Sequence, residues 1–148
     1  MLIRAFTFED YQPSIDLWFR IEGLGLNESD TPGAISAFLD RNPGFSAVAT
    51  DTVGNIIGTI LCGHNGRAGS IQHLAVAVEY RGQGIAKRLL DYAFEHLAEA
   101  GIPRCNIFVY NDNHQGNAFW LNNGWSDPTT WRVLQKPVAL APDQKLGS

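Results

Sequence analysis

Hydrophobic and polar positions follow two different rhythms along this chain, and the change comes near residue 45. In the N-terminal third, an apolar strand is expected over residues 2–6, and apolar residues recur at helical spacing over residues 13–20. A cap at Asp30 or Thr31 followed by Pro32 predicts a second helix, which the Asn42-Pro43 pair ends. Residues 22–30 lie between these helices and are glycine-rich and polar, which predicts a mobile loop.

From residue 45 onward, short apolar runs separated by turn residues predict strands, interrupted by one long amphipathic helix that ends at Gly101. The expected strands cover residues 45–50, 56–62, 70–78 and 105–109, a short helix covers 116–121, and a final hairpin covers 125–127 and 131–135. We therefore predict an α/β (α+β) fold, with a mixed sheet of about six or seven strands flanked by about four helices. The helical crossover makes its fourth and fifth strands parallel.

The most informative stretch is residues 71–90, where a buried strand, a glycine turn and a helix start follow one another. Gly82 and Gly84 allow backbone to approach a ligand, so the free N–H groups of the first helical turn predict an anion site. A P-loop is excluded because Gly84 is not followed by Lys and Ser or Thr. A dinucleotide fingerprint is excluded because Lys87 stands where its third glycine would be.

What remains, Arg81-x-x-Gly84-x-Ala86, resembles the pyrophosphate-binding motif of the GCN5-related N-acetyltransferase (GNAT) family. Leu74 to Val76 before it, and Asn113 with Trp120 and Gly124-Trp125 after it, strengthen the resemblance. The resemblance covers residues 45–125 well and the N-terminal third only in the order of its elements. It implies one GNAT-like domain over residues 1–136 with a tail at 137–148, a sheet splayed between its fourth and fifth strands, and acetyl-CoA as the cofactor.

The resemblance also implies where the cofactor would bind. The backbone of Leu74, Ala75 and Val76 would meet the thioester and the pantetheine amides. The diphosphate would lie on the loop and first helical turn, formed by Arg81, Gly82, Gln83, Gly84, Ile85, Ala86 and Lys87. Asn113 would contact pantetheine or cap the last helix. Two plainer readings stay open: a tight strand-to-helix connection without a ligand, and a solvated helix face for Lys87 and Arg88.

For catalysis, the N–H of Leu74 is the natural oxyanion donor, and His73 is the candidate general base. A histidine that only packs or hydrogen-bonds locally is the alternative. Many family members have a Tyr as general acid where this chain has Trp120, whose indole cannot release its proton, so Tyr110, His114 or solvent would replace it. Phe108 stands where members that acetylate ribosomal-protein N-termini carry a Glu, which weakens a protein N-terminus as the acceptor.

The acceptor is expected opposite the cofactor, in an apolar pocket with an acidic rim that suits a small amine or amino acid. Its candidate residues are Trp18, Phe19 and Trp131 with Glu28 or Asp30. The alternative is that the aromatic residues belong to the core and the acids to a solvated loop.

Composition narrows the partners. The net charge of −4 gives no basic field for nucleic acid or an anionic membrane, and the N-terminus shows no long apolar run, so a cytoplasmic protein is expected. Cys62 and Cys105 are isolated, so neither a disulfide nor a metal site is expected.

We predict an N-acetyltransferase that acts on a small-molecule amine by direct attack in a ternary complex. A protein lysine or N-terminal acetyltransferase and a non-catalytic acyl-CoA-binding or sensing domain are the alternatives. Homodimers are common among relatives, and the sequence leaves that question open.

Overall fold

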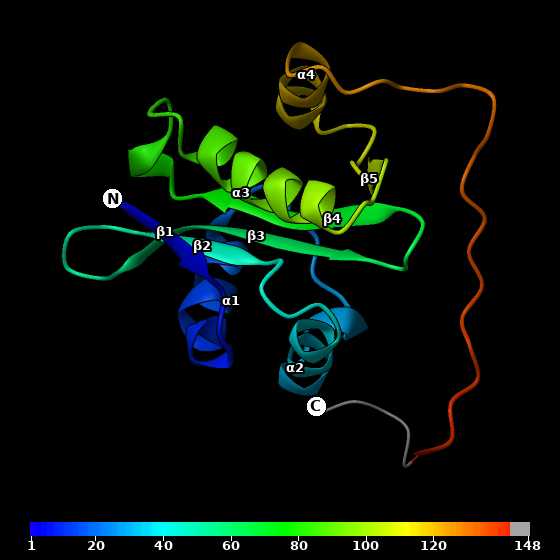
Figure 1. The fold of residues 1–148 in the computed structure, drawn as a ribbon, viewed down its shortest axis with the longest axis horizontal. Coiled ribbons are helices and arrows are strands. Elements are labelled where there is room, and N and C mark those ends of the chain that lie inside the picture. The colour runs from blue at the N-terminus through cyan, green and yellow to red at the C-terminus, as the bar shows by residue number, and fades with distance from the viewer. Residues whose placement is uncertain (143–148) are drawn as a thin grey trace.

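The computed structural model describes residues 1–142 and forms a five-stranded sheet with helices on both faces (Figure 1). Its strands are β1 (Leu2–Ala5), β2 (Ala47–Thr50), β3 (Ile56–His64), β4 (Gly69–Val76) and β5 (Cys105–Ile107). Its helices are α1 (Tyr11–Arg20), α2 (Pro32–Arg41), α3 (Ile85–Glu99) and α4 (His114–Asn122), with short 3-10 turns η1 (Phe8–Asp10), η2 (Glu28–Asp30) and η3 (Val78–Tyr80). No helix in this described part is long and apolar enough to cross a membrane.

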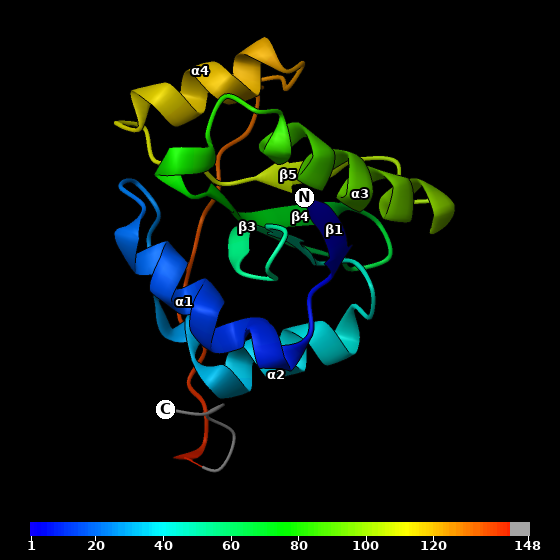
Figure 2. The ribbon, with the colours of Figure 1, turned by 90° about the vertical axis from the view of Figure 1, so that its left-hand side faces the viewer.

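The strands lie in chain order, antiparallel from β1 to β4 and parallel between β4 and β5. Figure 2 shows α3 and α4 on one side of the sheet and α1 and α2 on the other. Two hydrophobic cores result. One joins the sheet to α3 through Leu89, Ala93 and Leu97, and the other joins it to α1 and α2 through Trp18 and Ile35. The predicted single mixed α/β domain is confirmed.

The parallel pair β4 and β5 separates early, as the sequence predicted. Hydrogen-bonded register joins only Gly69 to Cys105, Ser70 to Asn106 and Ile71 to Ile107. β4 continues beyond this pairing to Val76, so its last five residues have no neighbour on the β5 side. Backbone groups on that edge are available to an extended ligand.

A bulge interrupts β4 at the point of separation. The register with β3 passes from Gln72 opposite Leu61 to Ala75 opposite Thr59, so His73 and Leu74 together face a single residue of β3. His73 has φ +49°, a left-handed conformation that is uncommon for a residue with a side chain and is often found at functional sites.

Beyond the bulge, side chains alternate between the two cores. Leu74 and Val76 pack toward α3, whereas Ala75 lies in the core under α1. Val78, which the sequence placed in the same strand, does not continue this alternation. The strand ends at Val76, and Val78 lies in η3 with 64% of its surface exposed.

Helix α3 ends as its sequence predicts. Gly101 has φ +74° and donates to the carbonyl of Ala98, while Ile102 donates to the carbonyl of Leu97. This pair of bonds is a Schellman motif, which satisfies the last carbonyls of the helix. The helix of the β4–β5 crossover thus ends at Gly101.

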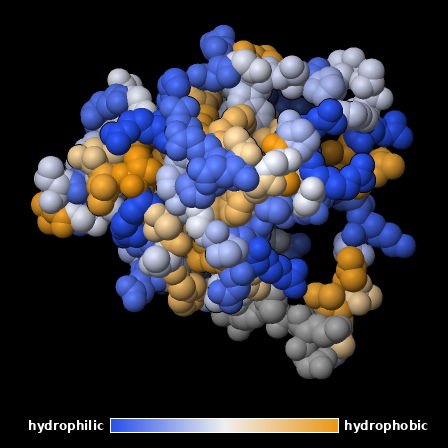
Figure 3. All heavy atoms as spheres, in the orientation of Figure 1, coloured by the Kyte–Doolittle hydropathy of each residue, from blue (hydrophilic) through white to orange (hydrophobic). Residues whose placement is uncertain are grey.

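The predicted C-terminal hairpin is wrong. Residues 123–142 contain no strand, so the described sheet has five strands where six or seven were expected. This segment runs from α4 past the sheet toward the side of α2 (Figure 1) and exposes Trp131, Val133 and Leu134. Figure 3 shows hydrophobic residues on its outlying part, beside the grey atoms. β5 offers only three residues as a pairing partner, and Pro128 lacks a donor for a ladder. Of the predicted tail, residues 143–148 lie outside the described part.

Candidate active site

The glycine loop and the first turn of α3 present a row of backbone N–H groups. Gly82 and Gly84 have φ of +77° and +79°, which only glycine adopts readily, and the first helical bond runs from Arg88 N to Gly84 O at 3.1 Å. The amides of Ile85, Ala86 and Lys87 therefore have no carbonyl of the preceding turn to bind. They point outward at the positive end of a helix, and this arrangement fits a diphosphate.

Only some of the backbone N–H groups between β4 and α3 are available to an anion. The N–H groups of Ala77, Tyr80 and Arg81 donate to Ile57 O, Ala77 O and Val78 O at 2.8, 2.9 and 3.3 Å, so they are already used. Within the described residues, the backbone N–H groups from Gly82 to Lys87, including that of Gln83, have no backbone acceptor. The candidate anion site is thus limited to these six amides.

The cationic side chains of Arg81 and Lys87 beside the loop bind other groups of the protein. The guanidinium of Arg81 donates to the carbonyl of Val76 at 3.3 Å, and Lys87 forms an exposed ion pair with Asp91 at 3.1 Å. Such exposed pairs contribute little energy, so either side chain can turn to a ligand at small cost. The helix N-terminus is the fixed part of the candidate anion site.

At the bulge, the peptide between His73 and Leu74 is held from one side. The hydroxyl of Thr59 donates to the carbonyl of His73 at 2.8 Å and accepts from the indole N–H of Trp18 at 2.8 Å. Because C=O and N–H point in opposite directions across a trans peptide, the N–H of Leu74 points away from β3. It faces the edge of β4 that β5 leaves uncovered, where a thioester carbonyl would lie.

The side chain of His73 turns to the opposite core and forms a close pair with Asp30. Nε2 of His73 lies 2.6 Å from Oδ1 of Asp30, and their side chains are only 12% and 8% exposed. The indole of Trp18 packs on the imidazole with ring centroids 4.5 Å apart. Burial by itself would raise the pKa of Asp30, but hydrogen bonds from His73 and from the N–H of Asn27 outweigh it, and the pKa lies below its ordinary value.

Asp30 is held by its own local structure as well. Its Oδ2 accepts the backbone N–H of Asn27 at 2.9 Å, and Oδ1 of Asn27 accepts the N–H of Ser29, which together cap η2. The hydroxyl of Tyr11 donates to the carbonyl of Asp30 at 2.6 Å inside the core. The sequence placed Asp30 at the acidic rim of a pocket, whereas the structure buries it.

Two predicted site residues meet the loop between α1 and η2. Asn113 accepts the N–H of Gly116 at 3.0 Å and so caps α4, one of its two predicted roles, and its amide lies against Gly23. The hydroxyl of Tyr110 lies directly against Gly25, so close that a Cβ at that position would overlap it. These contacts bring the loop to the chain that leaves β5.

Trp120, by contrast, is not brought to His73. It lies in the core beside α3, with Phe119 and Trp125 edge-on at 5.1 and 5.0 Å. His73 packs toward the other face of the sheet. Trp120 packs in the same cluster as Leu74, and a place for it beside the thiolate stays a prediction.

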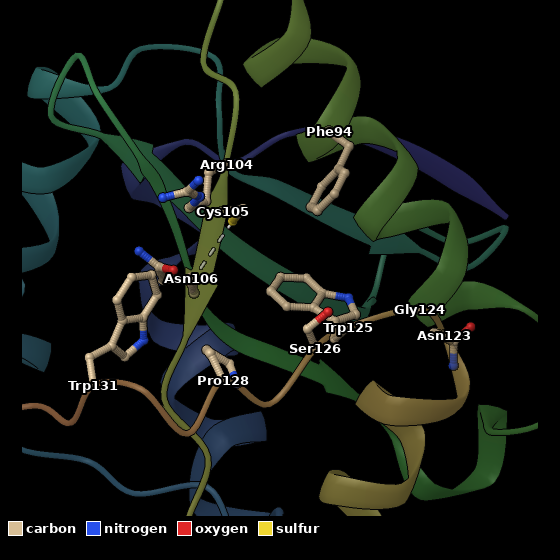
Figure 4. A pocket seen from close by; sticks show the side chains of 10 residues that line it. All are labelled: Phe94, Arg104, Cys105, Asn106, Asn123, Gly124, Trp125, Ser126, Pro128 and Trp131. Carbon is tan, nitrogen blue, oxygen red and sulfur yellow. Dashed lines mark hydrogen bonds between the residues drawn. The ribbon is translucent and has the colours of Figure 1, made fainter.

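The predicted aromatic acceptor pocket does not form. Trp18 is completely buried and hydrogen-bonded, Phe19 is exposed, and Trp131 lies at the outer edge of β5. There it lines a pocket of about 360 Å³ with Phe94, Arg104, Cys105, Asn106 and Trp125, among others (Figure 4). Burial raises the pKa of the Cys105 thiol to about 11, so this cysteine is a poor nucleophile. The pocket contains none of the predicted catalytic residues.

The structure thus combines a mixed sheet whose parallel strands separate, a bulge at the point of separation, and a helix N-terminus beside it, which together define an α/β domain. The model of the Acetyltransferase (GNAT) family matches residues 5–125. The acetyltransferase SG1711 of Sodalis glossinidius is 34% identical over 113 residues, which cover 76% of this chain and 78% of the relative. The acetyltransferase plu1384 of Photorhabdus laumondii is 35% identical over the same shares.

Solved structures agree on the fold. A Chaetomium thermophilum Naa20 in complex with a bisubstrate analogue superposes with a TM-score of 0.75 at 23% identity, covering 85% of this chain and 71% of that one. A GNAT-family acetyltransferase from Staphylococcus aureus gives 0.72 at 19% identity, covering 90% and 91%. The chain belongs to the GNAT family and is an acyltransferase.

Sequence reasoning missed Thr59 and assigned Asp30 to a different place. Thr59 gave no signal, because a threonine in an apolar strand is ordinary. Asp30 did give a sequence signal. It stands three residues after Asn27, and this is the spacing of a capping box, which fixes the carboxylate in place.

Proposed function

We propose that this protein transfers an acetyl group from acetyl-CoA to the primary amine of a small molecule or amino acid, by direct attack within a ternary complex. The observation that carries the proposal is the bulge in β4. There Leu74 has no register partner on β3 or β5, and the imidazole of His73 turns to the face of the sheet that carries Asp30. Acyl transfer to an amine needs both a donor for the developing oxyanion and an acceptor for the amine proton.

The residues fit acetyl-CoA at both ends. The amides of residues 82–87 suit its diphosphate, and the uncovered edge of β4 from Leu74 to Val76 suits the amide arm. When bound, acetyl-CoA supplies the activated thioester. The protein contributes the strand edge that aligns the acetyl carbonyl and the helix N-terminus that anchors the far end of the cofactor.

We assign the roles of oxyanion donor, general base and general acid to three groups. The N–H of Leu74, held by Thr59 through the carbonyl of His73, stabilises negative charge on the acetyl oxygen. The imidazole of His73 accepts a proton from the amine, directly or through water. Tyr110, beside Gly25 in the loop that borders the acceptor side, is the proposed proton donor to the thiolate.

A small acceptor is favoured by the contacts at the mouth of the site. Tyr110 against Gly25 and Asn113 against Gly23 close the gap between the α1–η2 loop and the chain after β5. An extended peptide would have to part these contacts, whereas a short amine would not. A cytoplasmic location and a homodimer stay predictions.

A thiol-release assay tests the proposal. Purified protein with acetyl-CoA is offered a panel of small amines, free amino acids, lysine peptides and peptide N-termini. Turnover on small amines or amino acids is expected. Preference for peptides would favour a protein acetyltransferase instead. Tight CoA binding, measured by calorimetry, without turnover on any acceptor would identify a binding or sensing domain.

A further inference from the structure

We propose that Asp30 is the positioning residue for His73, fixing the imidazole as the tautomer with its proton on Nε2 and a free lone pair on Nδ1. This inference rests on the proposed role of His73 as the base. It assigns a task to a carboxylate that the chain carries on a different element, 43 residues away in sequence.

The direction of the hydrogen bond follows from the charge of Asp30. An ionised carboxylate can only accept, and the pKa of Asp30 lies below its ordinary value in this site. Nε2 of His73, at 2.6 Å from Oδ1, must therefore carry a proton. In a neutral imidazole this leaves Nδ1 as the only nitrogen able to accept one.

The geometry allows little freedom at either end of the pair. Oδ2 of Asp30 is committed to the N–H of Asn27, and its carbonyl to the hydroxyl of Tyr11. The imidazole is packed against Trp18, and the backbone of His73 is tied to Thr59. A carboxylate held at one oxygen by a capping turn thus presents the other oxygen to the ring in one orientation. The titratable groups at His73 are Asp30 and, behind it, Tyr11.

This arrangement predicts a specific consequence for Asp30→Asn. The position of Oδ2 must stay an acceptor for the N–H of Asn27, so the amide oxygen of the variant takes that place. The amide nitrogen then faces His73 and donates to Nε2. The imidazole proton is forced onto Nδ1, and the nitrogen meant to act as base is lost.

The chain offers a matched control in Asp10→Asn. Asp10 is as buried as Asp30, also caps a 3-10 turn by accepting an N–H at 2.9 Å, from Thr7, and also has a lowered pKa. Its partner, however, is Arg4, at 2.8 Å. The control therefore removes an equivalent charge and keeps the equivalent cap, without touching His73.

The decisive measurement is the two-bond proton–nitrogen NMR correlation of the histidine rings in the full-length protein at pH 8. Two other histidines supply references. His96 must donate from Nδ1 to the carbonyl of Tyr92, and His64 must accept at Nδ1 from the N–H of Gly66. His73, assigned by loss of its signal in His73→Asn, is expected to match His64 in the wild type and in Asp10→Asn. In Asp30→Asn it should match His96.

Activity gives the second readout. In Asp30→Asn, kcat/KM is expected to fall at least about tenfold through kcat, while CoA affinity and the activity of Asp10→Asn stay within about twofold of wild type. A wild-type His73 that matches His96, or a tautomer unchanged by Asp30→Asn, would overturn the inference whatever the activity. Absence of turnover in the wild type would instead contradict the proposed function, and the NMR result would still decide the role of Asp30.

Discussion

The indole N–H of Trp18 donates to the hydroxyl of Thr59 at 2.8 Å in the core between α1 and the sheet. The Thr59 hydroxyl in turn donates its single proton to the carbonyl of His73 at 2.8 Å. A helix, a central strand and the bulge are thereby joined in one directed chain of hydrogen bonds. The orientation of the Leu74 amide depends on this chain, because it shares a peptide plane with the carbonyl of His73.

Replacing Thr59 with Val keeps the shape of the side chain and removes both hydrogen bonds. The buried N–H of Trp18 loses its partner, so the free energy of unfolding should fall by about 1–3 kcal/mol. The Leu74 amide loses its fixed orientation, and kcat should fall about tenfold, less than for loss of an oxyanion donor. Urea unfolding and steady-state kinetics measure the two effects.

Thr50→Val is the control, since Thr50 is also a buried strand threonine but its side chain has no hydrogen-bond partner among the described residues. If Thr59→Val lowered stability yet left kcat unchanged, the hydroxyl would not govern the Leu74 amide.

Gly84→Glu should abolish CoA binding in a domain that still folds. The variant places a carboxylate at the helix N-terminus that is proposed to bind a diphosphate, and φ of +79° adds a strain of about 1–2 kcal/mol. Gly101→Glu carries the same charge and nearly the same strain, at φ +74°, but at the other end of α3. Calorimetry with CoA should therefore detect binding for Gly101→Glu and none for Gly84→Glu. Equal affinities would remove the loop from the site.

Local signals explain why part of this structure could be predicted from sequence. Gly82, Gly84 and Gly101 mark the two ends of α3 by conformations that other residues resist, and no distant contact is needed to recognise them. The parallel pairing of β4 and β5 follows from the helical crossover in the same segment, and their separation was implied by the family resemblance. The glycine loop and the strand edge were therefore placed correctly.

Contacts between distant segments explain what the sequence did not reveal. Asp30 and His73 meet only because α1 and η2 cover the sheet, and a one-residue bulge decides which way His73 turns. The hairpin prediction was wrong because a contact that it needs is missing. The alternation over residues 131–135 is compatible with a strand, but a strand also needs a partner edge, and β5 has only three residues.

The stabilising effect of Asp30 should depend on pH in one direction. Burial opposes its charge, but the bonds from His73 and Asn27 prevail, so the folded-state pKa lies below the ordinary value of 3.8. Such a group stabilises the fold fully above the unfolded-state pKa and loses its effect as pH falls through the folded-state pKa. Asp30→Asn should thus cost about 1.5–3 kcal/mol at pH 7 and progressively less below about pH 4.

Urea unfolding of wild type and Asp30→Asn from pH 7 to pH 3 measures this difference. Asp10→Asn should follow the same course, since the pKa of Asp10 is lowered too, chiefly by Arg4 against its own burial. A difference that grows as pH falls below about 4 would contradict the assigned direction of the pKa shift.

His73→Asn separates a base from a packing residue through the pH dependence of the rate. Asparagine tolerates the left-handed backbone at φ +49° better than most residues, so the bulge is retained while the imidazole is lost. An alkyl amine with a pKa near about 10 is almost wholly protonated at pH 7 and needs a proton acceptor, but it loses its proton to solvent as pH rises. If His73 is the base, kcat/KM should fall about 10²–10⁴-fold at pH 7 and far less at pH 9.5. His64→Asn, at the distant end of β3, should leave the profile unchanged. The same loss at every pH would mean that the imidazole shapes the bulge and accepts no proton, and the base would then have to be sought in water or in the acceptor itself.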